Sequence, residues 1–97
     1  MPTVEIVRID GSKEMLTTNA RGTSLVRFIS QQIGCDTCDV VNLRDGRMMS
    51  VDDTGLLTGK PRNEAATKIV QAIYPLYKQR DVFIAGDVAI ALDEDFA

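Results

Sequence analysis

The spacing of apolar residues changes from a strand pattern to a helical pattern along the first third of the chain. Thr3–Ile9 is rich in β-branched residues and predicts a strand, and Lys13–Thr18 predicts a second strand beyond the turn-forming sequence Asp10-Gly11-Ser12. A helix is predicted from Thr23 or Ser24, either of which can cap it, to Gly34. Its buried stripe is predicted to hold Leu25, Phe28, Ile29 and Ile33.

The middle of the chain predicts a second hairpin and a second helix. Asp39–Leu43 and Met48–Val51 are the expected strands, and Asp45-Gly46 between them suits the positive φ angles of a two-residue type I′ turn. The long loop Asp52–Arg62 contains three turn-forming residues, and Asn63 is a good N-cap for the helix after it. That helix buries a stripe of Ala66, Ile69, Val70 and Ile73 and ends or kinks at Pro75.

The C-terminal third predicts the last strand. Val82–Ala85 and Val88–Leu92 are two strands, or one strand broken at Gly86-Asp87, and the acidic tail Asp93–Ala97 is expected to fray. One domain over residues 1–97 then follows, with a single mixed sheet of about five strands and two helices packed on one face. The predicted order of this α+β class is ββαββαβ, and its first half resembles the layout of ubiquitin-like β-grasp domains, with the second helix as an insertion before the last strand. The chain lacks the terminal Gly-Gly of conjugating members.

Charge and composition narrow the possible functions. The 97 residues carry a net charge of −3 and no histidine. An acidic chain is a poor match for the phosphate backbone of nucleic acid, so no direct nucleic-acid partner is expected. Without histidine, Ser-His-Asp and Cys-His catalysis and histidine zinc sites are impossible within one chain. Without histidine or a complete catalytic set, we expect a non-enzymatic protein without a cofactor. No apolar run reaches the roughly 20 residues of a membrane span, and no secretory signal is visible. We therefore expect a cytoplasmic protein without a membrane partner.

Cys35 and Cys38 form a C-x-x-C sequence with three possible meanings. A redox dithiol is disfavoured because the pair follows a helix C-terminus and lies beside Asp36 and Asp39, which oppose thiolate formation. A structural zinc ion takes four ligands, so zinc would have to link two chains as a dimer. The interpretation with the most support is two small, partly buried thiols in a turn.

The loop Gly59–Asn63 is the best candidate for binding an anionic ligand. Gly55–Lys60 resembles the phosphate-binding P-loop, but it has one residue too few between its glycines, and Pro61 stands where the motif needs Ser or Thr. The candidate ligand-binding residues are nevertheless next to a helix N-terminus, where backbone N–H groups favour anions. They are Gly59, Lys60, Arg62 and Asn63. The alternative is a solvated loop that sets the entry angle of the helix.

Two further groups of residues are candidates for partner or metal contact. Arg44 and Arg47 flank the predicted hairpin tip, and Tyr74 and Tyr77 lie near the kink at Pro75, so these four are the candidate partner-binding residues. Core packing is the alternative for the tyrosines. Three carboxylates could hold a hard cation but lack the spacing of an EF-hand, so they are more simply turn formers. They are Asp45, Asp52 and Asp53.

One segment resembles a known family. From about Thr23 to Leu92, the chain is similar to the domain of unknown function 3846, found in small proteins of bacteria, phages and plasmids. The resemblance is carried by VVNLRDGRMMSVDDTGLL, by TGKPRNEAAT opening a helix and by VFIAGDVAIAL, with Gly86-Asp87 before the last strand. The N-terminal hairpin and the cysteine pair depart from the family pattern. The family implies no activity or catalytic residue, but it does imply an accessory protein of a mobile element.

We therefore expect a small interaction module that binds and modulates a host protein, as a monomer or a homodimer. The alternative is a binder of a nucleotide or another anionic ligand at the Gly59–Asn63 loop. A zinc-linked dimer through Cys35 and Cys38 is a third, minor alternative.

Overall fold

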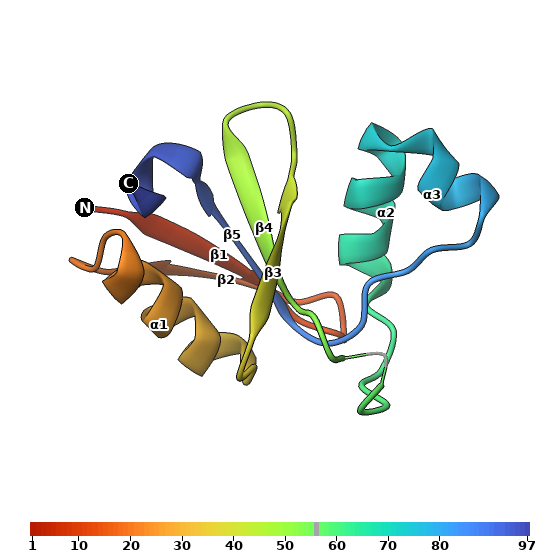
Figure 1. Cartoon of the computed structure of the whole chain (residues 1–97), viewed down its shortest axis with the longest axis horizontal. Coiled ribbons are helices and arrows are strands. Elements are labelled where there is room, and N and C mark those ends of the chain that lie inside the picture. Colours follow the sequence, from red (N-terminus) through yellow and green to blue (C-terminus); the bar gives the residue numbers. More distant parts are fainter. Residues whose placement is uncertain (56) are drawn as a thin grey trace.

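A five-stranded sheet forms the centre of the protein in a computed structural model that describes residues 1–55 and 57–97 (Figure 1). The sheet has the order β2-β1-β5-β4-β3, and every pairing between these strands is antiparallel. The strands are β1 (Thr3–Val7), β2 (Lys13–Thr17), β3 (Cys38–Asn42), β4 (Arg47–Asp52) and β5 (Val88–Leu92). The predicted α+β class with one five-stranded sheet is confirmed. The expected mixed sheet is wrong, because β5 returns antiparallel to both of its neighbours.

The helices number more than the sequence predicted. They are α1 (Thr23–Ile33), α2 (Glu64–Ile73), α3 (Pro75–Gln79) and the 3₁₀-helix η1 (Asp93–Phe96). Pro75 ends α2 as expected, but it also starts α3, because proline fits the first position of a helix. The order is therefore ββαββααβ followed by η1.

The C-terminal tail is ordered, where fraying was expected. η1 lies beside the start of α1, the backbone N–H of Gly22 donates to the Asp95 carbonyl oxygen at 3.0 Å, and Arg21 pairs with the Asp95 carboxylate at 2.8 Å. These contacts leave Asp95 only 5% exposed. Val82–Ala85 is also not a strand, since only Ala85 makes a bridge, to Arg62.

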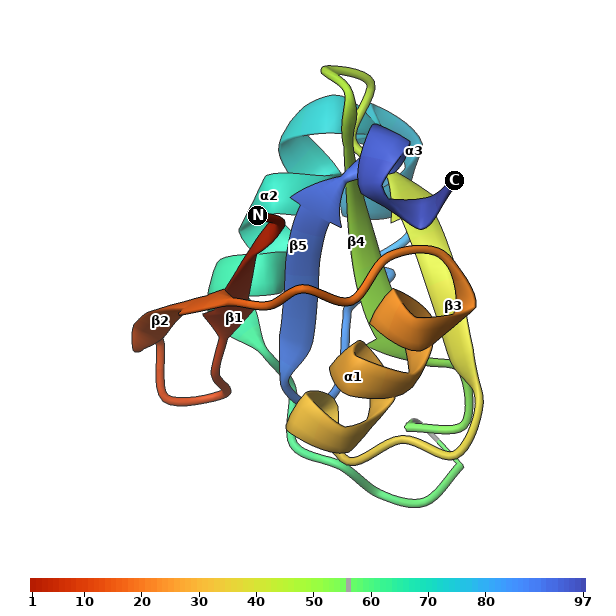
Figure 2. The ribbon, with the colours of Figure 1, turned by 90° about the vertical axis from the view of Figure 1, so that its left-hand side faces the viewer.

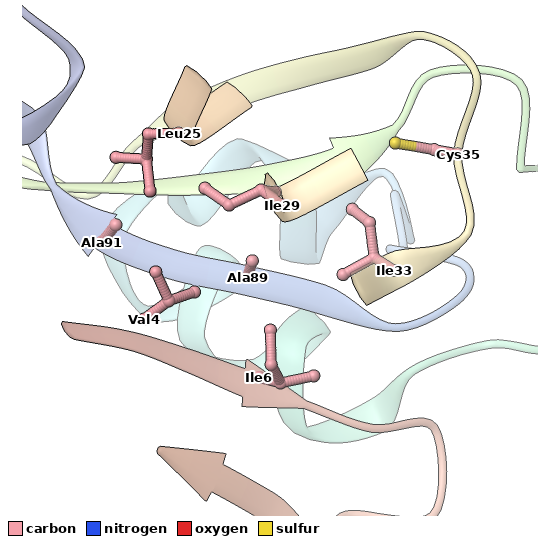
Figure 3. Close-up of a cluster of buried hydrophobic side chains, with 8 residues drawn as sticks. All are labelled: Val4, Ile6, Leu25, Ile29, Ile33, Cys35, Ala89 and Ala91. Atoms are coloured by element: carbon pink, nitrogen blue, oxygen red, sulfur yellow. The ribbon is translucent and has the colours of Figure 1, made fainter. Parts of the chain in front are cut away.

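Helices cover both faces of the sheet, not one face as predicted. α1 lies against one face, while α2 and α3 lie against the other (Figures 1 and 2). The core on the α1 side is drawn in Figure 3 and contains Val4, Ile6, Leu25, Ile29, Ile33, Cys35, Ala89 and Ala91. The core on the α2 side contains Val7, Leu43, Met49, Val51, Ala66, Val70, Val88 and Ile90. The stripes predicted for both helices therefore face the sheet.

The sequence of β5 matches its place in the middle of the sheet. Ala89 and Ala91 face α1, and Val88 and Ile90 face α2, so four consecutive residues of the strand are buried. Side chains of a strand alternate between faces, and a strand covered on both sides therefore reads as a continuous apolar run. The small alanines leave room for α1 to pack closely.

Local start and stop signals were predicted with mixed success. Gly34 ends α1 in the left-handed region with φ of 67°, and Asn63 caps α2, both as expected. The side-chain cap predicted for Thr23 or Ser24 is wrong, since Gly22 occupies the N-cap position without a side-chain bond. No helix in the described ranges is long and apolar enough to cross a membrane.

Candidate functional site

Three of the four candidate partner-binding residues meet at one surface. The Arg44 guanidinium carbon lies 4.4 Å from the centroid of the Tyr74 ring, and the Tyr74 and Tyr77 rings stack with centroids 5.4 Å apart. Together with Ile73, Pro75 and Leu76, these residues line an open hollow of about 210 Å³. We call this surface the tyrosine hollow.

The backbone of the hairpin tip directs Arg44 toward Tyr74. Arg44 has a φ of 64°, in the left-handed region, and its N–H donates to the side-chain oxygen of Asn42 at 2.7 Å. The two-residue type I′ turn predicted at Asp45-Gly46 is wrong. Positive φ falls on Arg44 and Gly46, while the Leu43 N–H closes a longer loop by donating to the Arg47 carbonyl oxygen at 3.0 Å.

Asn42 fixes the other half of the same surface. The Tyr74 hydroxyl donates to its carbonyl oxygen at 2.6 Å, while the Asn42 side chain holds the backbone of Arg44. Tyr74 is therefore attached to the β3 edge of the sheet at its hydroxyl and lies under Arg44 at its ring face. The hollow is held in shape before any partner arrives, which lowers the entropic cost of binding.

The break between α2 and α3 exposes an apolar residue beside the aromatic stack. Tyr74 ends α2, and α3 starts at once with Pro75, so the chain changes direction there. Leu76 is consequently 58% exposed and no residue of α3 is buried. Aromatic residues and arginine around an accessible apolar side chain are the composition that binding hot spots favour.

Arg44 lines the hollow, and two further cations, Lys78 and Arg80, follow its α3 residues in a chain that is acidic as a whole. Within the described ranges, Arg44, Lys78 and Arg80 form no ion pair. Lys78 belongs to α3 and Arg80 follows it directly. Charges without an internal partner remain available to an acidic group of another molecule.

Arg47, the fourth candidate partner-binding residue, lies away from the tyrosine hollow. Its guanidinium binds the Asp45 carboxylate at 2.9 Å, and this contact lowers the pKa of Asp45 below its ordinary value. The side chain of Arg47 lines a second hollow of about 390 Å³, together with Glu5, Met15, Ile90 and Leu92 of β1, β2 and β5. We call this the sheet hollow.

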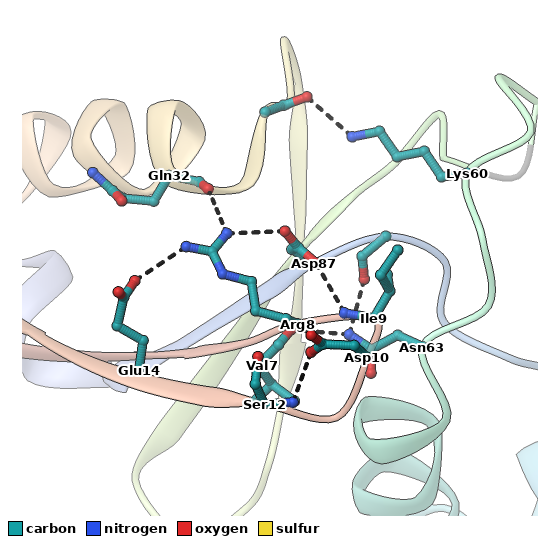
Figure 4. A network of polar contacts seen from close by, with 12 residues as sticks. Val7, Arg8, Ile9, Asp10, Ser12, Glu14, Gln32, Lys60, Asn63 and Asp87 are labelled. Atoms are coloured by element: carbon teal, nitrogen blue, oxygen red, sulfur yellow. Dashed lines mark hydrogen bonds and ion pairs between the residues drawn. The ribbon is translucent and has the colours of Figure 1, made fainter.

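Lys60, the first cation of the predicted ligand loop, binds other groups of the chain. The Lys60 ammonium lies 2.6 Å from the Asp52 carboxylate and donates to the Gly34 carbonyl oxygen at 3.0 Å, the latter drawn in Figure 4. Lys60 thus joins the loop to the end of β4 and to the C-terminus of α1. The hydrogen bond from Lys60 lowers the pKa of Asp52 below the ordinary value.

Arg62 and Asn63 are also engaged within the chain. The Arg62 Nε lies 2.5 Å from the Glu64 carboxylate, in an alignment that makes no hydrogen bond, and the guanidinium lies over the Phe83 ring at 5.1 Å. Asn63 is fully buried. Its side-chain oxygen accepts from the Ala66 N–H at 3.0 Å as the cap of α2. Lys60, Arg62 and Asn63 therefore lie together at a helix N-terminus, as predicted, but each of them already binds other groups of the chain.

The two cysteines are joined. Cys35 and Cys38 form a disulfide with their Cα atoms 6.2 Å apart, so the predicted pair of free thiols is wrong for this structure. A zinc-linked dimer would first require reduction of this bond. No group of three or more potential metal-ligating side chains occurs among the described residues. Asp45 and Asp52 accept from the backbone N–H groups two residues on, at 3.2 and 3.0 Å, as turn formers do. Each also pairs with a cation of the chain.

Sequence reasoning found the tyrosines and Arg44 but missed three contributors to the hollow. Asn42 contributes through a backbone carbonyl and a turn contact, and Pro75 and Leu76 contribute because α3 exists. The signal for α3 was available, since proline directly after a helix can start another one.

Comparison with known proteins adds no relative: no family model, no curated protein and no solved structure matches this chain. The resemblance to the domain of unknown function 3846 therefore stays a prediction.

Proposed function

We propose that this chain is a small non-enzymatic module that binds another protein through the tyrosine hollow. The observation that carries the proposal is the stack of Arg44, Tyr74 and Tyr77 beside the exposed Leu76. Residues from two distant parts of the chain converge there, and Asn42 fixes their positions. Such preorganised aromatic and arginine clusters are typical of binding hot spots.

The chemistry of the hollow favours one kind of partner segment. The apolar lining suits a protruding leucine, methionine or aromatic side chain. Arg44, Lys78 and Arg80 favour carboxylates on either side of that anchor, because they have no ionic partner of their own among the described residues. An apolar anchor with acidic neighbours is therefore the proposed recognition element. A role as an accessory protein that modulates a host protein rests on the family resemblance alone.

A matched peptide panel tests this proposal. Peptides with one apolar anchor would be flanked by aspartates in one set and by lysines in the other, and backbone amide shifts of the protein would be followed by NMR. We expect the acidic set to shift amides at residues 73, 74 and 76–78 and around Arg44. Leu76→Asp should abolish these shifts. Val26→Asp is the control: Val26 is also an exposed apolar residue, but it lies on α1, so this substitution should leave the amide shifts unchanged. Equal shifts with both peptide sets, or none, would overturn the proposal.

The alternative of an anionic ligand at Gly59–Asn63 has less support. Lys60 and Arg62 already neutralise carboxylates of the chain, and Asn63 is buried. A ligand there would have to displace Asp52 or Glu64. Phosphate-bearing ligands should accordingly leave the melting temperature unchanged, and a rise that Lys60→Ala removes would favour this alternative.

A further inference from the structure

The two edges of the sheet differ in how their backbone groups are satisfied. At the β3 edge, two of the outward-facing groups find side-chain partners within the chain. The Val40 N–H donates to the Asp39 carboxylate at 2.8 Å, and the Asn42 carbonyl oxygen accepts from the Tyr74 hydroxyl at 2.6 Å. Proteins block exposed strand edges in this way against pairing with other chains.

The β2 edge has no such protection. Next to the β1–β2 ladder, the Thr18 N–H donates to the Pro2 carbonyl oxygen and the Arg8 N–H to that of Ser12. Hydrogen-bonded pairs alternate along an antiparallel ladder, so the even-numbered residues of β2 bond to β1. The backbone N–H and C=O groups of Lys13, Met15 and Thr17 consequently point away from the sheet. None of them has a hydrogen-bond partner among residues 1–55 and 57–97.

These outward groups are complementary to a second copy of themselves. If two β2 strands meet antiparallel with Met15 opposite Met15 of the partner subunit, Lys13 lies opposite Thr17 of the partner subunit. Every outward N–H then faces an outward C=O, because hydrogen-bonding residues are opposite one another. A two-fold axis through this point is the symmetry that the commonest homodimers have.

The side chains also fit this register. Glu14, already paired with Arg8 at 3.1 Å, would lie opposite Leu16 of the partner subunit, so no like charges face each other. Met15 is 61% exposed and lines the sheet hollow. Across the axis it would contact Met15 of the partner subunit and cover apolar surface on both chains.

We propose that the free edge of β2 binds a second copy of this chain, joining two five-stranded sheets into one. The occupant follows from the self-complementary register and from the absence of opposed like charges. The β3 edge is partly blocked by Asp39 and Tyr74, whereas the outward groups of β2 are all free among the described residues. β2 and β3 lie at opposite ends of the strand order, so both tyrosine hollows stay open in the dimer. Such a dimer would present two binding surfaces and gain avidity for repeated partners.

Sedimentation equilibrium of the full chain up to about 1 mM tests the proposal, since an interface one strand wide is small and of a weak class. We expect the wild type to reach a dimer mass. Met15→Lys would place two ammonium groups opposite each other and should raise the dissociation constant by at least about tenfold. Met15→Pro removes an outward N–H without removing a bond to β1, and it should have the same effect.

Val40→Lys on the β3 edge is the matched control, because Val40 is 43% exposed and its N–H is already bonded. This variant should dimerise like the wild type. Hydrogen exchange should show the amides of Lys13, Met15 and Thr17 becoming protected as concentration rises, while the amide of Val40 does not change. A wild type that stays monomeric, or a dimer that survives both Met15 variants, would overturn the proposal.

Discussion

The side-chain amide nitrogen of Asn63 donates to the carbonyl oxygen of Val7 at 2.9 Å and to that of Gly86 at 3.0 Å (Figure 4). The residue that caps α2 therefore also joins β1 to the segment that enters β5. Because Asn63 is fully buried, water cannot replace these bonds. One amide thus holds α2 against the centre of the sheet.

This double role predicts that Asn63→Asp is strongly destabilising, although aspartate is as good a cap as asparagine on an exposed helix. The carboxylate could still accept from Ala66, but it would face two carbonyl oxygens with no proton to donate. We expect a loss of about 3–5 kcal/mol in the free energy of unfolding at pH 7, measured by urea denaturation. A loss below about 1 kcal/mol would show that the bridge to Val7 and Gly86 contributes little.

Arg44→Gly should separate binding from folding. Glycine adopts the φ of 64° found at Arg44 without strain, while the substitution removes the guanidinium from the face of Tyr74. We expect the melting temperature to stay within a few degrees of wild type and the affinity for acidic-flanked peptides to fall by about tenfold, as a lost cation contact at a hot spot would cause. Arg47→Ala, at the other side of the hairpin tip, should bind those peptides like the wild type.

The ion pair between Asp52 and Lys60 should make stability depend on pH. Lys60 lowers the pKa of Asp52 in the folded protein below its ordinary value of 3.8. A carboxylate with a depressed folded pKa stabilises the protein above its unfolded pKa, and the stabilisation is lost as the pH falls through the folded pKa. Asp52→Asn can still accept the bond from Thr54, so it removes the charge selectively.

We therefore expect Asp52→Asn to cost about 1–2 kcal/mol of unfolding free energy at pH 7, with the difference from wild type shrinking steadily below pH 3.8. Urea titrations at several pH values measure it. Asp53→Asn is the control, because Asp53 makes no ion pair among the described residues. A difference between wild type and Asp52→Asn that does not change with pH would contradict the assignment.

Gly86→Ala should cost more stability than Gly46→Ala. Both glycines have φ near 85°, at 83° and 88°, so both substitutions carry the same backbone strain. A Cβ at Gly86 would lie 2.9 Å from the Lys60 Cδ, whereas one at Gly46 meets nothing within 4 Å. We expect about 1 kcal/mol of loss for Gly46→Ala and about 2–3 kcal/mol for Gly86→Ala by thermal unfolding. Equal losses would show that Lys60 moves aside freely.

Prediction from the sequence succeeded where the signal was local. The strands β1, β2 and β5, the helix stripes of α1 and α2, the end of α1 at Gly34 and the cap at Asn63 all depend on residues within a few positions of one another. It failed where distant contacts decide. η1, for example, is ordered by Arg21 and Gly22. The bond between Cys35 and Cys38 is a different case, because their short spacing permits it but does not require it.

The α+β class, the main helices and strands, and the two tyrosines near a proline kink all follow from the order of residues along the chain. The antiparallel place of β5 between β1 and β4, the helices on both faces and the contact of Arg44 with Tyr74 emerge only when the chain is folded. The difference lies in the distance along the chain over which the interactions act. Periodicity and turn chemistry act over a few residues, whereas strand order and side-chain stacking depend on which buried surfaces fit together across the whole chain.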